Sequence, residues 1–413
     1  MNTIRIAVIG GGAAGMMAAI FAARAGAEVT LIERMNACGK KLRITGKGRC
    51  NVTNDCSLQE FLQNVPTNPR FLYGALSFFS TEDTKRFFED AGVPLKVERG
   101  RRVFPVSDKA EDIVRALTDL CRAEGITLRF GRAEALLSEN GAISGVTVDG
   151  ETIDADRVIV CTGGLSYPRT GSDGDGYRLA QSVGHTVTPL TPSLVPIVSK
   201  SKLCPALLGL SLRNVSLSIV QKQSGKVIYE DFGEMLFTHF GMTGPMILSA
   251  SAHIPDAVSG NYEARINLKP ALDEKTLDER IRSDFSKYAN KDFSNALDDL
   301  LPRKLIPVVI SLSGIDPRKK VNSITKDERR ALVGVIRKLR ISIDGFRPIS
   351  EAIVTKGGVS VKEIQPKTME SKLCKGLFFA GEVLDLDAYT GGFNLQIAFS
   401  TGALAGVSAA ETR

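Results

Sequence analysis

The fold is decided by residues 4–33, which read IRIAVIGGGAAGMMAAIFAARAGAEVTLIE. The apolar run Ile4–Ile9 predicts a short parallel strand that is buried on both faces. Glycines follow in the spacing G-x-G-x-x-G, after which Ala13–Ala25 predicts a helix and Glu28–Glu33 a second strand. Strand, glycine turn, helix and strand in this order are typical of a dinucleotide-binding unit.

Each feature of such a unit has a physical role that a residue here can fill. Gly10 allows the tight turn, Gly12 lets the backbone approach a pyrophosphate, and Gly15 permits close packing of helix on strand. The N-terminus of the helix offers free N–H groups to the phosphates. Glu33 can accept hydrogen bonds from a ribose diol, and an acid there disfavours a 2′-phosphate, which leaves FAD or NAD. The alternative is a glycine-rich turn that binds no ligand.

The next segment, Arg34–Asn54, predicts a ligand-wrapping loop. It contains six lysines and arginines and no acid, and three glycines allow its backbone to approach a ligand. A solvated basic loop is the alternative.

A second glycine-rich stretch reads Gly171-Ser172-Asp173-Gly174-Asp175-Gly176. It resembles a phosphate loop, but its two aspartates would repel a pyrophosphate and it does not directly follow a strand. We interpret it as a decoy, so that NADH or NADPH, if used, would dock transiently against the flavin domain.

Periodicity predicts the remaining elements of the first half. Helices are expected at Leu76–Ala91 and Lys109–Glu124. Short antiparallel strands are expected at Leu128–Phe130, Ala133–Leu137, Ile143–Val148 and Glu151–Ile153. A buried strand, Arg157–Cys161, opens into the turn Thr162-Gly163-Gly164, as where a flavoprotein chain returns to its nucleotide.

The far end of the chain favours FAD over NAD. Leu377–Ala380 predicts a strand that is followed by Glu382, an acid able to bind the ribitol of FAD. After Thr390-Gly391-Gly392, a helix is expected from about Asn394 to Ala410. The N-terminus of that helix can stabilise the negative charge of a reduced flavin ring.

Composition describes an ordinary globular protein with a local excess of positive charge. The 413 residues are 43% hydrophobic and 24% charged, which excludes a disordered or fibrous chain. The formal net charge is +7. Arg303–Arg340 alone contains eleven lysines and arginines and three acids. Within it, Thr325–Arg340 predicts an amphipathic helix, and Thr325 with Glu328 predicts a capping box at its start. Such a basic run fits an anionic partner such as RNA, and a solvated helix face is the alternative.

Cysteine and histidine usage predicts no metal site. Seven cysteines form no CxxC pair and only three histidines are present, so no zinc ligand set can be drawn. Scattered cysteines are typical of reduced thiols, the N-terminal strand is not a signal peptide, and no apolar run reaches the ~20 residues of a membrane span. We expect a cytoplasmic protein without a membrane segment.

These motifs resemble the BaiN-like family of bacterial NAD(P)/FAD-dependent oxidoreductases. That family includes proposed bile-acid enone reductases and the enzymes that form dihydrouridine in large-subunit ribosomal RNA, and some relatives carry an aminoacetone-oxidase label. The resemblance covers essentially the whole chain. It is carried by six blocks: Gly10–Gly15, Gly39–Asn54, Arg102–Pro105, Thr162–Tyr167, Leu236–Pro245 and Phe379–Gln396.

The resemblance implies an α/β architecture with a Rossmann-like FAD-binding domain of the two-dinucleotide-binding-domains type. A β-rich domain with a small helical insert interrupts it. Composition changes near residues 189, 269 and 345 fit this division. The expected segments are a first FAD-binding part (1–188), the β-rich domain (189–268), a basic helical lid (269–340) and a return through the β-rich domain to the FAD-binding domain (341–413).

The resemblance also implies the cofactor contacts, residue by residue. The FAD-binding residues would be Gly10, Gly12, Ala13, Ala14, Gly15, Glu33, Lys41, Gly46, Gly48, Arg49, Cys50, Asn51, Gly164, Gly381, Glu382, Gly392, Asn394 and Leu395. One departure is Lys47, where many relatives have glycine.

The leading hypothesis is a reductase in which NADH or NADPH supplies electrons, through FAD, to a conjugated C=C bond. Cys50, His239 and Tyr389 are the candidate proton donors, and each has packing or a structural hydrogen bond as its alternative role. Uridine in large-subunit rRNA, bound through Arg303–Arg340, leads as substrate. A small-molecule enone reductase, an amine oxidase and a non-catalytic FAD-containing RNA-binding factor are the alternatives.

Overall fold

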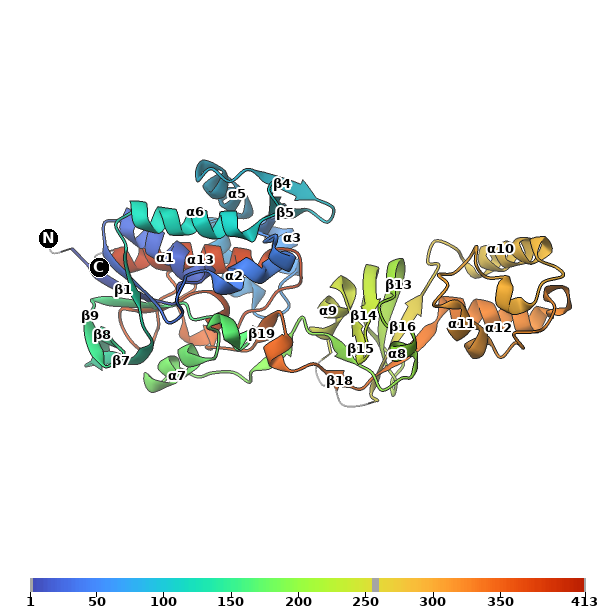
Figure 1. Cartoon of the computed structure of the whole chain (residues 1–413). Coiled ribbons are helices and arrows are strands. Elements are labelled where there is room, and N and C mark those ends of the chain that lie inside the picture. Colours follow the sequence, from blue (N-terminus) through green and yellow to red (C-terminus); the bar gives the residue numbers. More distant parts are fainter. Residues whose placement is uncertain (1–2, 255–259, 412–413) are drawn as a thin grey trace. The chain divides into compact units, whose positions relative to one another are not determined.

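The computed structural model describes residues 3–254 and 260–411, and the chain divides into two compact units. The first unit consists of the residues up to Ser193 and those from Pro348 onward (Figure 1). The second unit is Leu194–Arg347. Whether residues 269–340 form a domain of their own stays a prediction. Within the described residues, no helix has the length and apolar character that crossing a membrane requires.

A five-stranded parallel sheet forms the centre of the first unit, and four of its strands are predicted from the sequence. Its order is β20 (Leu377–Phe379), β10 (Arg157–Val160), β1 (Arg5–Ile9), β2 (Glu28–Glu33) and β6 (Thr127–Phe130). The central strand β1 is buried along Ile6–Ile9, which explains its continuous apolar sequence. Because parallel strands end at the same edge, the residues after β1, β10 and β20 meet there.

The strand β6 corrects one expectation. Leu128–Phe130 is predicted as part of an antiparallel group, but β6 pairs in parallel with β2. The antiparallel group consists of the other three predicted strands, which form the sheet β7 (Ala133–Glu139), β8 (Ala142–Val148) and β9 (Glu151–Asp154).

Three helices pack together in the first unit, and two of them run in the same direction. They are α1 (Ala13–Arg24), α6 (Ala110–Ala123) and α13 (Phe393–Ala410). A Cβ on Gly402 would lie 2.4 Å from the Ala14 carbonyl oxygen, and one on Gly406 would lie 2.2 Å from that of Ala18. The equal spacing of these contacts shows that α1 and α13 are parallel and touch through their backbones.

The predicted helix Leu76–Ala91 is wrong as a single element. The structure has α4 (Tyr73–Phe78) and α5 (Thr81–Asp90) instead. The break lies at Ser80, whose hydroxyl accepts from the Asp83 N–H while the Asp83 carboxylate accepts from the Ser80 N–H, a capping box.

The other elements of the first unit are short. They are α2 (Lys40–Ile44), α3 (Leu58–Gln63) and α7 (Asp175–Ser182), the sheet of β3 (Thr53–Asn54), β5 (Arg102–Pro105) and β4 (Leu95–Glu98), and the pair β11 (Thr191–Ser193) and β19 (Val354–Lys356).

An antiparallel sheet forms one part of the second unit. Its order is β17 (Leu339–Ile343), β16 (Tyr262–Asn267), β13 (Ser211–Gln221), β14 (Val227–Phe237), β15 (Gly241–Thr243), β12 (Ile197–Val198) and β18 (Gly345–Phe346). The helices of this unit are α8 (Leu203–Ala206), α9 (Pro245–Ser251), α10 (Glu274–Lys287), α11 (Ile306–Ser313) and α12 (Lys326–Arg337). Sheet and helices share one hydrophobic core.

The basic segment Arg303–Arg340 therefore spans helices and a strand. The expected helix Thr325–Arg340 ends at Arg337, and Arg340 lies in β17. The predicted capping box is confirmed, since the Thr325 hydroxyl accepts from the Glu328 N–H and the Glu328 carboxylate from the Thr325 N–H.

Candidate dinucleotide-binding site

The loop Gly10–Gly15 joins β1 to α1, and close backbone contacts require two of its glycines. Gly10 has φ +105°, and a Cβ there would lie 2.5 Å from the Cys161 carbonyl oxygen. A Cβ on Gly15 would lie 1.8 Å from the Gly10 carbonyl oxygen. At Gly12, in contrast, a Cβ would meet no described atom within 4 Å. The open side of Gly12 leaves room for a pyrophosphate to approach the backbone, so this loop fits a dinucleotide.

The carboxylate of Glu33 lies against this loop at the end of β2. One oxygen accepts from the Gly11 N–H at 2.8 Å, and the other accepts from the Met35 N–H at 2.7 Å. The residue is 8% exposed. Burial raises the pKa of Glu33, and the two backbone hydrogen bonds partly offset that shift. The position suits an acceptor for the ribose next to the pyrophosphate.

Because α1 and α13 pack in parallel, their two N-termini are offset from each other along the helix axes. Ala14 lies beside Gly402, one residue after the start of α1 but nine residues after the start of α13 at Phe393. At the helical rise this offset is about 12 Å. Two helix N-termini with this spacing fit an extended dinucleotide that carries groups needing positive charge at both places.

An ion pair joins the segment Arg34–Asn54 to the residues that follow β20. The Lys41 amine donates to a Glu382 carboxylate oxygen at 2.6 Å and to the Ser166 hydroxyl at 2.7 Å. The other Glu382 oxygen accepts from the Ser166 hydroxyl and the Thr355 N–H. Lys41 and Glu382, predicted as separate FAD contacts, therefore lie together.

Two more predicted glycines pack into this region. A Cβ on Gly164 would lie 2.5 Å from the Thr355 hydroxyl oxygen and 3.0 Å from a Glu382 oxygen. A Cβ on Gly381 would lie 2.8 Å from the Cβ of Ala14, which is the second residue of α1. The fold thus brings Gly381 to the Gly10–Gly15 loop.

The start of α13 is held against the block that contains Asn51. Gly392 has φ +98°, and a Cβ there would lie 2.3 Å from the Thr53 carbonyl oxygen. With the amide orientation that satisfies its hydrogen bonds, the Asn51 oxygen accepts from the Gly392 N–H at 3.0 Å. The Asn54 side chain donates to the Gly391 carbonyl at 3.0 Å.

Asn394 closes the loop that precedes α13. Its side-chain oxygen accepts from the Ala388 N–H, and its side-chain nitrogen donates to the carbonyls of Ala388 and Tyr389. Leu395 follows on the helix and is partly buried. Asn394 therefore holds the loop that carries Tyr389, in addition to any contact with a cofactor.

The sequence reasoning missed a buried polar network around Gln396. Its side-chain oxygen accepts from the Thr53 hydroxyl at 2.6 Å, and its nitrogen donates to the carbonyls of Phe79 and Ser80 and to the Ser400 hydroxyl. This network ties α13 to the break between α4 and α5. The signal that could have revealed it is a glutamine within a largely apolar helix.

The segment Arg34–Asn54, predicted as a loop, is partly helical. Besides α2 it contains a short helical turn at Thr45–Gly48 in which Gly46, Lys47 and Gly48 all have positive φ. Lys47 has φ +60°, a conformation that favours glycine. This accounts for the glycine that relatives are expected to carry there.

Arg49, an expected cofactor contact, is engaged elsewhere in this structure. Its guanidinium binds the carboxylates of Glu98 and Asp108 and lies 4.1 Å from the centre of the Phe104 ring. Its role toward FAD stays a prediction.

The three candidate proton donors have different surroundings. Cys50 is completely buried with φ +59°, and burial raises the pKa of its thiol to about 12. Tyr389 is half-buried on the loop before α13, and burial, together with the charge of Asp387, raises its pKa. His239 is exposed in the second unit, where its ring contacts the edge of Phe240. The structure therefore brings Cys50 and Tyr389, but not His239, into the unit that contains the dinucleotide loop.

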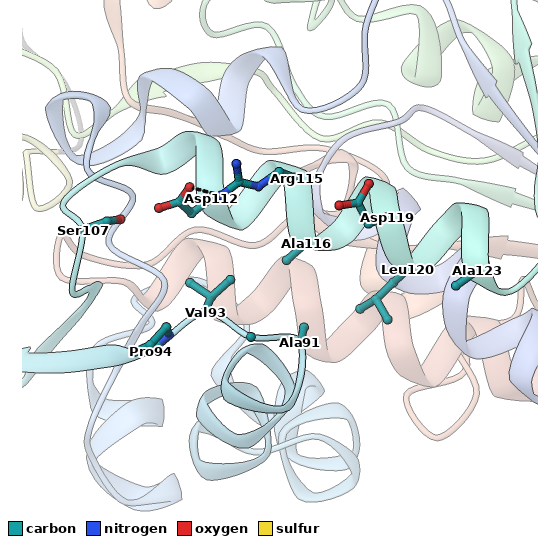
Figure 2. Close-up of a pocket in the computed structure, with 11 residues that line it drawn as sticks. Ala91, Val93, Pro94, Ser107, Asp112, Arg115, Ala116, Asp119, Leu120 and Ala123 are labelled. Carbon is teal, nitrogen blue, oxygen red and sulfur yellow. Dashed lines mark hydrogen bonds and ion pairs between the residues drawn. The ribbon is translucent and has the colours of Figure 1, made fainter.

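A groove elsewhere on the first unit is lined by none of the predicted site residues. Figure 2 shows it between α6 and the segment Ala91–Pro94, with Asp112 and Arg115 at its polar edge. Its volume is about 320 Å³.

Comparison with known proteins finds sequences that are similar over nearly the whole chain. A sequence family described as HI0933-like protein Rossmann domain matches residues 4–408. A 3-dehydro-bile acid delta(4,6)-reductase of Clostridium scindens is 34% identical over 98% of this chain and 99% of its own. A ribosomal RNA dihydrouridine synthase of Escherichia coli is 32% identical over 95% of both chains.

Solved structures share the fold. A 3-ketosteroid-delta4-(5alpha)-dehydrogenase from Rhodococcus jostii has a TM-score of 0.51 at 17% identity, covering 99% of this chain and 97% of its own. A 3-ketosteroid delta1-dehydrogenase from Sterolibacterium denitrificans has a TM-score of 0.52 at 13% identity and covers both chains completely. The predicted α/β fold with a Rossmann-like FAD-binding domain is confirmed.

Proposed function

The chain belongs to the HI0933-like family of FAD-dependent oxidoreductases, and we propose on that basis that it reduces a conjugated C=C bond with electrons from NADH or NADPH. The leading substrate is uridine in large-subunit ribosomal RNA, which the reaction converts to dihydrouridine. The proposal is supported by two relatives of similar identity whose names describe, respectively, a reductase and a dihydrouridine synthase.

Bound FAD supplies the hydride-transfer chemistry, and the protein supplies binding and orientation. Gly12 and the N-terminus of α1 would bind the pyrophosphate, and Glu33 would bind the adenosine ribose. Lys41 and Glu382 would lie along the ribitol, and the N-terminus of α13 would face the flavin ring. This order follows the offset of about 12 Å between the two helix starts.

Among the proton donors, Tyr389 is the first to test. A tyrosine phenol is protonated at neutral pH, as a donor must be, and burial raises the pKa of Tyr389 further. The Asn394 side chain donates to the backbone carbonyls of Ala388 and Tyr389, so the backbone that carries the phenol is held in place. Cys50 is also protonated, but it is completely buried.

The observation that favours RNA over a small molecule is the surface of the basic segment. Five of its eleven cations form ion pairs with acids: Lys319, Lys320, Arg329, Arg330 and Arg337. Of the remainder, Arg303, Arg318, Lys326, Lys338 and Arg340 are exposed, and none of these five has an ion-pair partner among the described residues. Exposed, unpaired cations are suited to phosphate contacts, whereas a steroid needs none.

Deleting the gene and analysing large-subunit rRNA by mass spectrometry tests the substrate. We expect one position that is dihydrouridine in the wild type to remain uridine, lighter by two hydrogens, and complementation with the wild-type gene to restore dihydrouridine. Unchanged rRNA would rule out this substrate. Anaerobic mixing of the purified flavoprotein with NADH and with NADPH tests the electron donor through bleaching of the flavin absorbance. If neither bleaches it, the protein is not an NAD(P)H-driven reductase.

A small-molecule enone is the second candidate, favoured by the relative named as a bile-acid reductase. The two candidates are separated by reoxidation of the reduced flavoprotein with an enone steroid or with rRNA fragments. Only the true substrate should restore the flavin absorbance without oxygen.

A further inference from the structure

The glycine-rich loop Gly171–Gly176 is packed into a fixed position beside the turn that follows Glu33, the residue predicted to bind the ribose. A Cβ on Gly171 would lie 3.0 Å from the Met35 side chain, and one on Gly176 would lie 1.9 Å from the Thr162 hydroxyl oxygen. Ser172, between them, is 6% exposed. Met35 is in turn the residue whose N–H binds Glu33. The loop therefore contacts the same turn that holds Glu33.

The two aspartates of this loop bind Arg34, the residue that follows Glu33. The Arg34 guanidinium donates to the Asp173 carboxylate and lies 3.4 Å from an oxygen of Asp175. Asp175 also accepts two hydrogen bonds from Arg132, at 2.8 and 2.7 Å, and lies 3.7 Å from Arg178. Asp175 is 14% exposed and Asp173 29%, so these carboxylates are only partly screened by water.

Arg34 occupies a place of chemical consequence. In dinucleotide folds the acid at the end of the second strand binds a free ribose diol, and a nearby arginine accommodates a 2′-phosphate. This chain has both groups in succession, since Glu33 is followed directly by Arg34. Left free, the guanidinium would offer a bidentate partner for a phosphate and would oppose the selectivity of Glu33.

We propose that the loop Gly171–Gly176 makes the adenosine end of the site selective for a free ribose diol, by engaging Arg34 so that it cannot receive a 2′-phosphate. The loop acts as a specificity element for FAD against nucleotides of the NADP type. Asp173 and Asp175, which would repel a pyrophosphate, thus serve to bind Arg34. The inference rests on the proposed assignment of Glu33 to the adenosine ribose.

The test measures binding, with the full-length protein freed of FAD. FAD affinity is followed by quenching of flavin fluorescence, and adenosine 5′-phosphate and adenosine 2′,5′-bisphosphate serve as competitors. In the wild type we expect the bisphosphate to compete at least ~10-fold more weakly. The substitution Asp173→Asn should reduce this preference about fivefold, since it releases one partly exposed charge pair.

A second variant at the other end of the ion pair should act in the opposite direction. Arg34→Gln removes the cation and leaves the carboxylates, so discrimination against the bisphosphate should increase. It also serves if Asp173→Asn does not fold. Asp119→Asn is the matched control, because Asp119 pairs with Arg122 on the surface of α6, and it should leave the preference unchanged.

Two results would overturn the proposal. One is a preference that changes less than twofold in both Asp173→Asn and Arg34→Gln while FAD still binds. The other is a wild type that binds both competitors equally. A wild type that binds no FAD would instead remove the site assignment, so the two failures are distinguishable.

Discussion

The dinucleotide loop of the first unit and the basic segment of the second illustrate two different ways in which a chain uses its residues. At Gly10 and Gly15 an added methyl group would overlap a carbonyl oxygen, so the identity of each residue is imposed by its neighbours. In Arg303–Arg340, several cations are exposed, and three others form ion pairs with acids in α10 or in the segment after it. A single substitution in the loop should therefore have a large effect on stability or on FAD affinity. Substitutions in the basic segment should each have a small, additive effect on RNA affinity, and that effect should depend on the salt concentration.

The largest effect should follow from Gly15→Ala. The Cβ would lie 1.8 Å from the Gly10 carbonyl oxygen, so α1 or the loop must move. We expect a loss of more than about 3 kcal/mol in the free energy of unfolding, measured by urea denaturation. A variant of wild-type stability would show that the loop is not rigid.

Gly12→Ala should separate binding from folding. Since its Cβ would meet no described atom within 4 Å, stability of the FAD-free protein should change by less than about 1 kcal/mol. Affinity for FAD should fall ~30-fold, because the methyl group occupies the approach of the pyrophosphate. Unchanged affinity in a fluorescence titration would contradict the assignment of Gly12.

Glu33→Gln should weaken FAD about tenfold and alter the pH dependence of stability. Burial raises the pKa of Glu33, so the folded state holds this proton more tightly than the unfolded state. The stability of the wild type relative to the variant should therefore be greatest below the pKa of an unfolded glutamate. It should decrease as the pH rises through the folded pKa. Urea titrations of both proteins without FAD, over acidic to neutral pH, check this sign.

In the basic segment, the double variant Lys338→Gln/Arg340→Gln should leave FAD affinity unchanged. If both cations contact phosphate, the slope of log affinity for rRNA fragments against log salt should decrease by about 1.5. Lys320→Gln is the matched control, because that amine already pairs with Asp292. An equal change in slope for control and double variant would indicate a diffuse charge effect.

The smallest effect belongs to Lys47→Gly. Lys47 has φ +60°, and glycine removes its backbone strain at some cost in the entropy of unfolding. We expect a gain in stability of less than about 1 kcal/mol, detected as a small rise in Tm. A clear loss would show that the lysine side chain makes a compensating contact.

Much of the local structure could be predicted from patterns in the chain. The glycine spacing, the apolar strand and the terminal acid specify β1, α1 and β2. The capping box at Thr325 and Glu328 marks the start of α12. The same signal, Ser80 followed by Asp83, was present at the break between α4 and α5, and it was overridden by apolar spacing across Leu76–Ala91.

Side-chain partners could not be predicted in this way. The sequence does not indicate, for example, that acids on β4 and before α6 bind the guanidinium of Arg49. The strand β6 is too short for its sequence to distinguish the two sheet types, and only its position beside β2 makes it parallel.

The sequence by itself determined the dinucleotide unit, because a tight turn, a backbone approach and a helix start depend on residues within about thirty positions of one another. The tertiary structure alone decided which charges meet. Lys41 pairs with Glu382, and Arg34 with Asp173, across separations of 341 and 139 residues. The energy of an ion pair depends on the distance between its charges in space. These charges come close only when the chain has folded and the parallel strands end at one edge of the sheet.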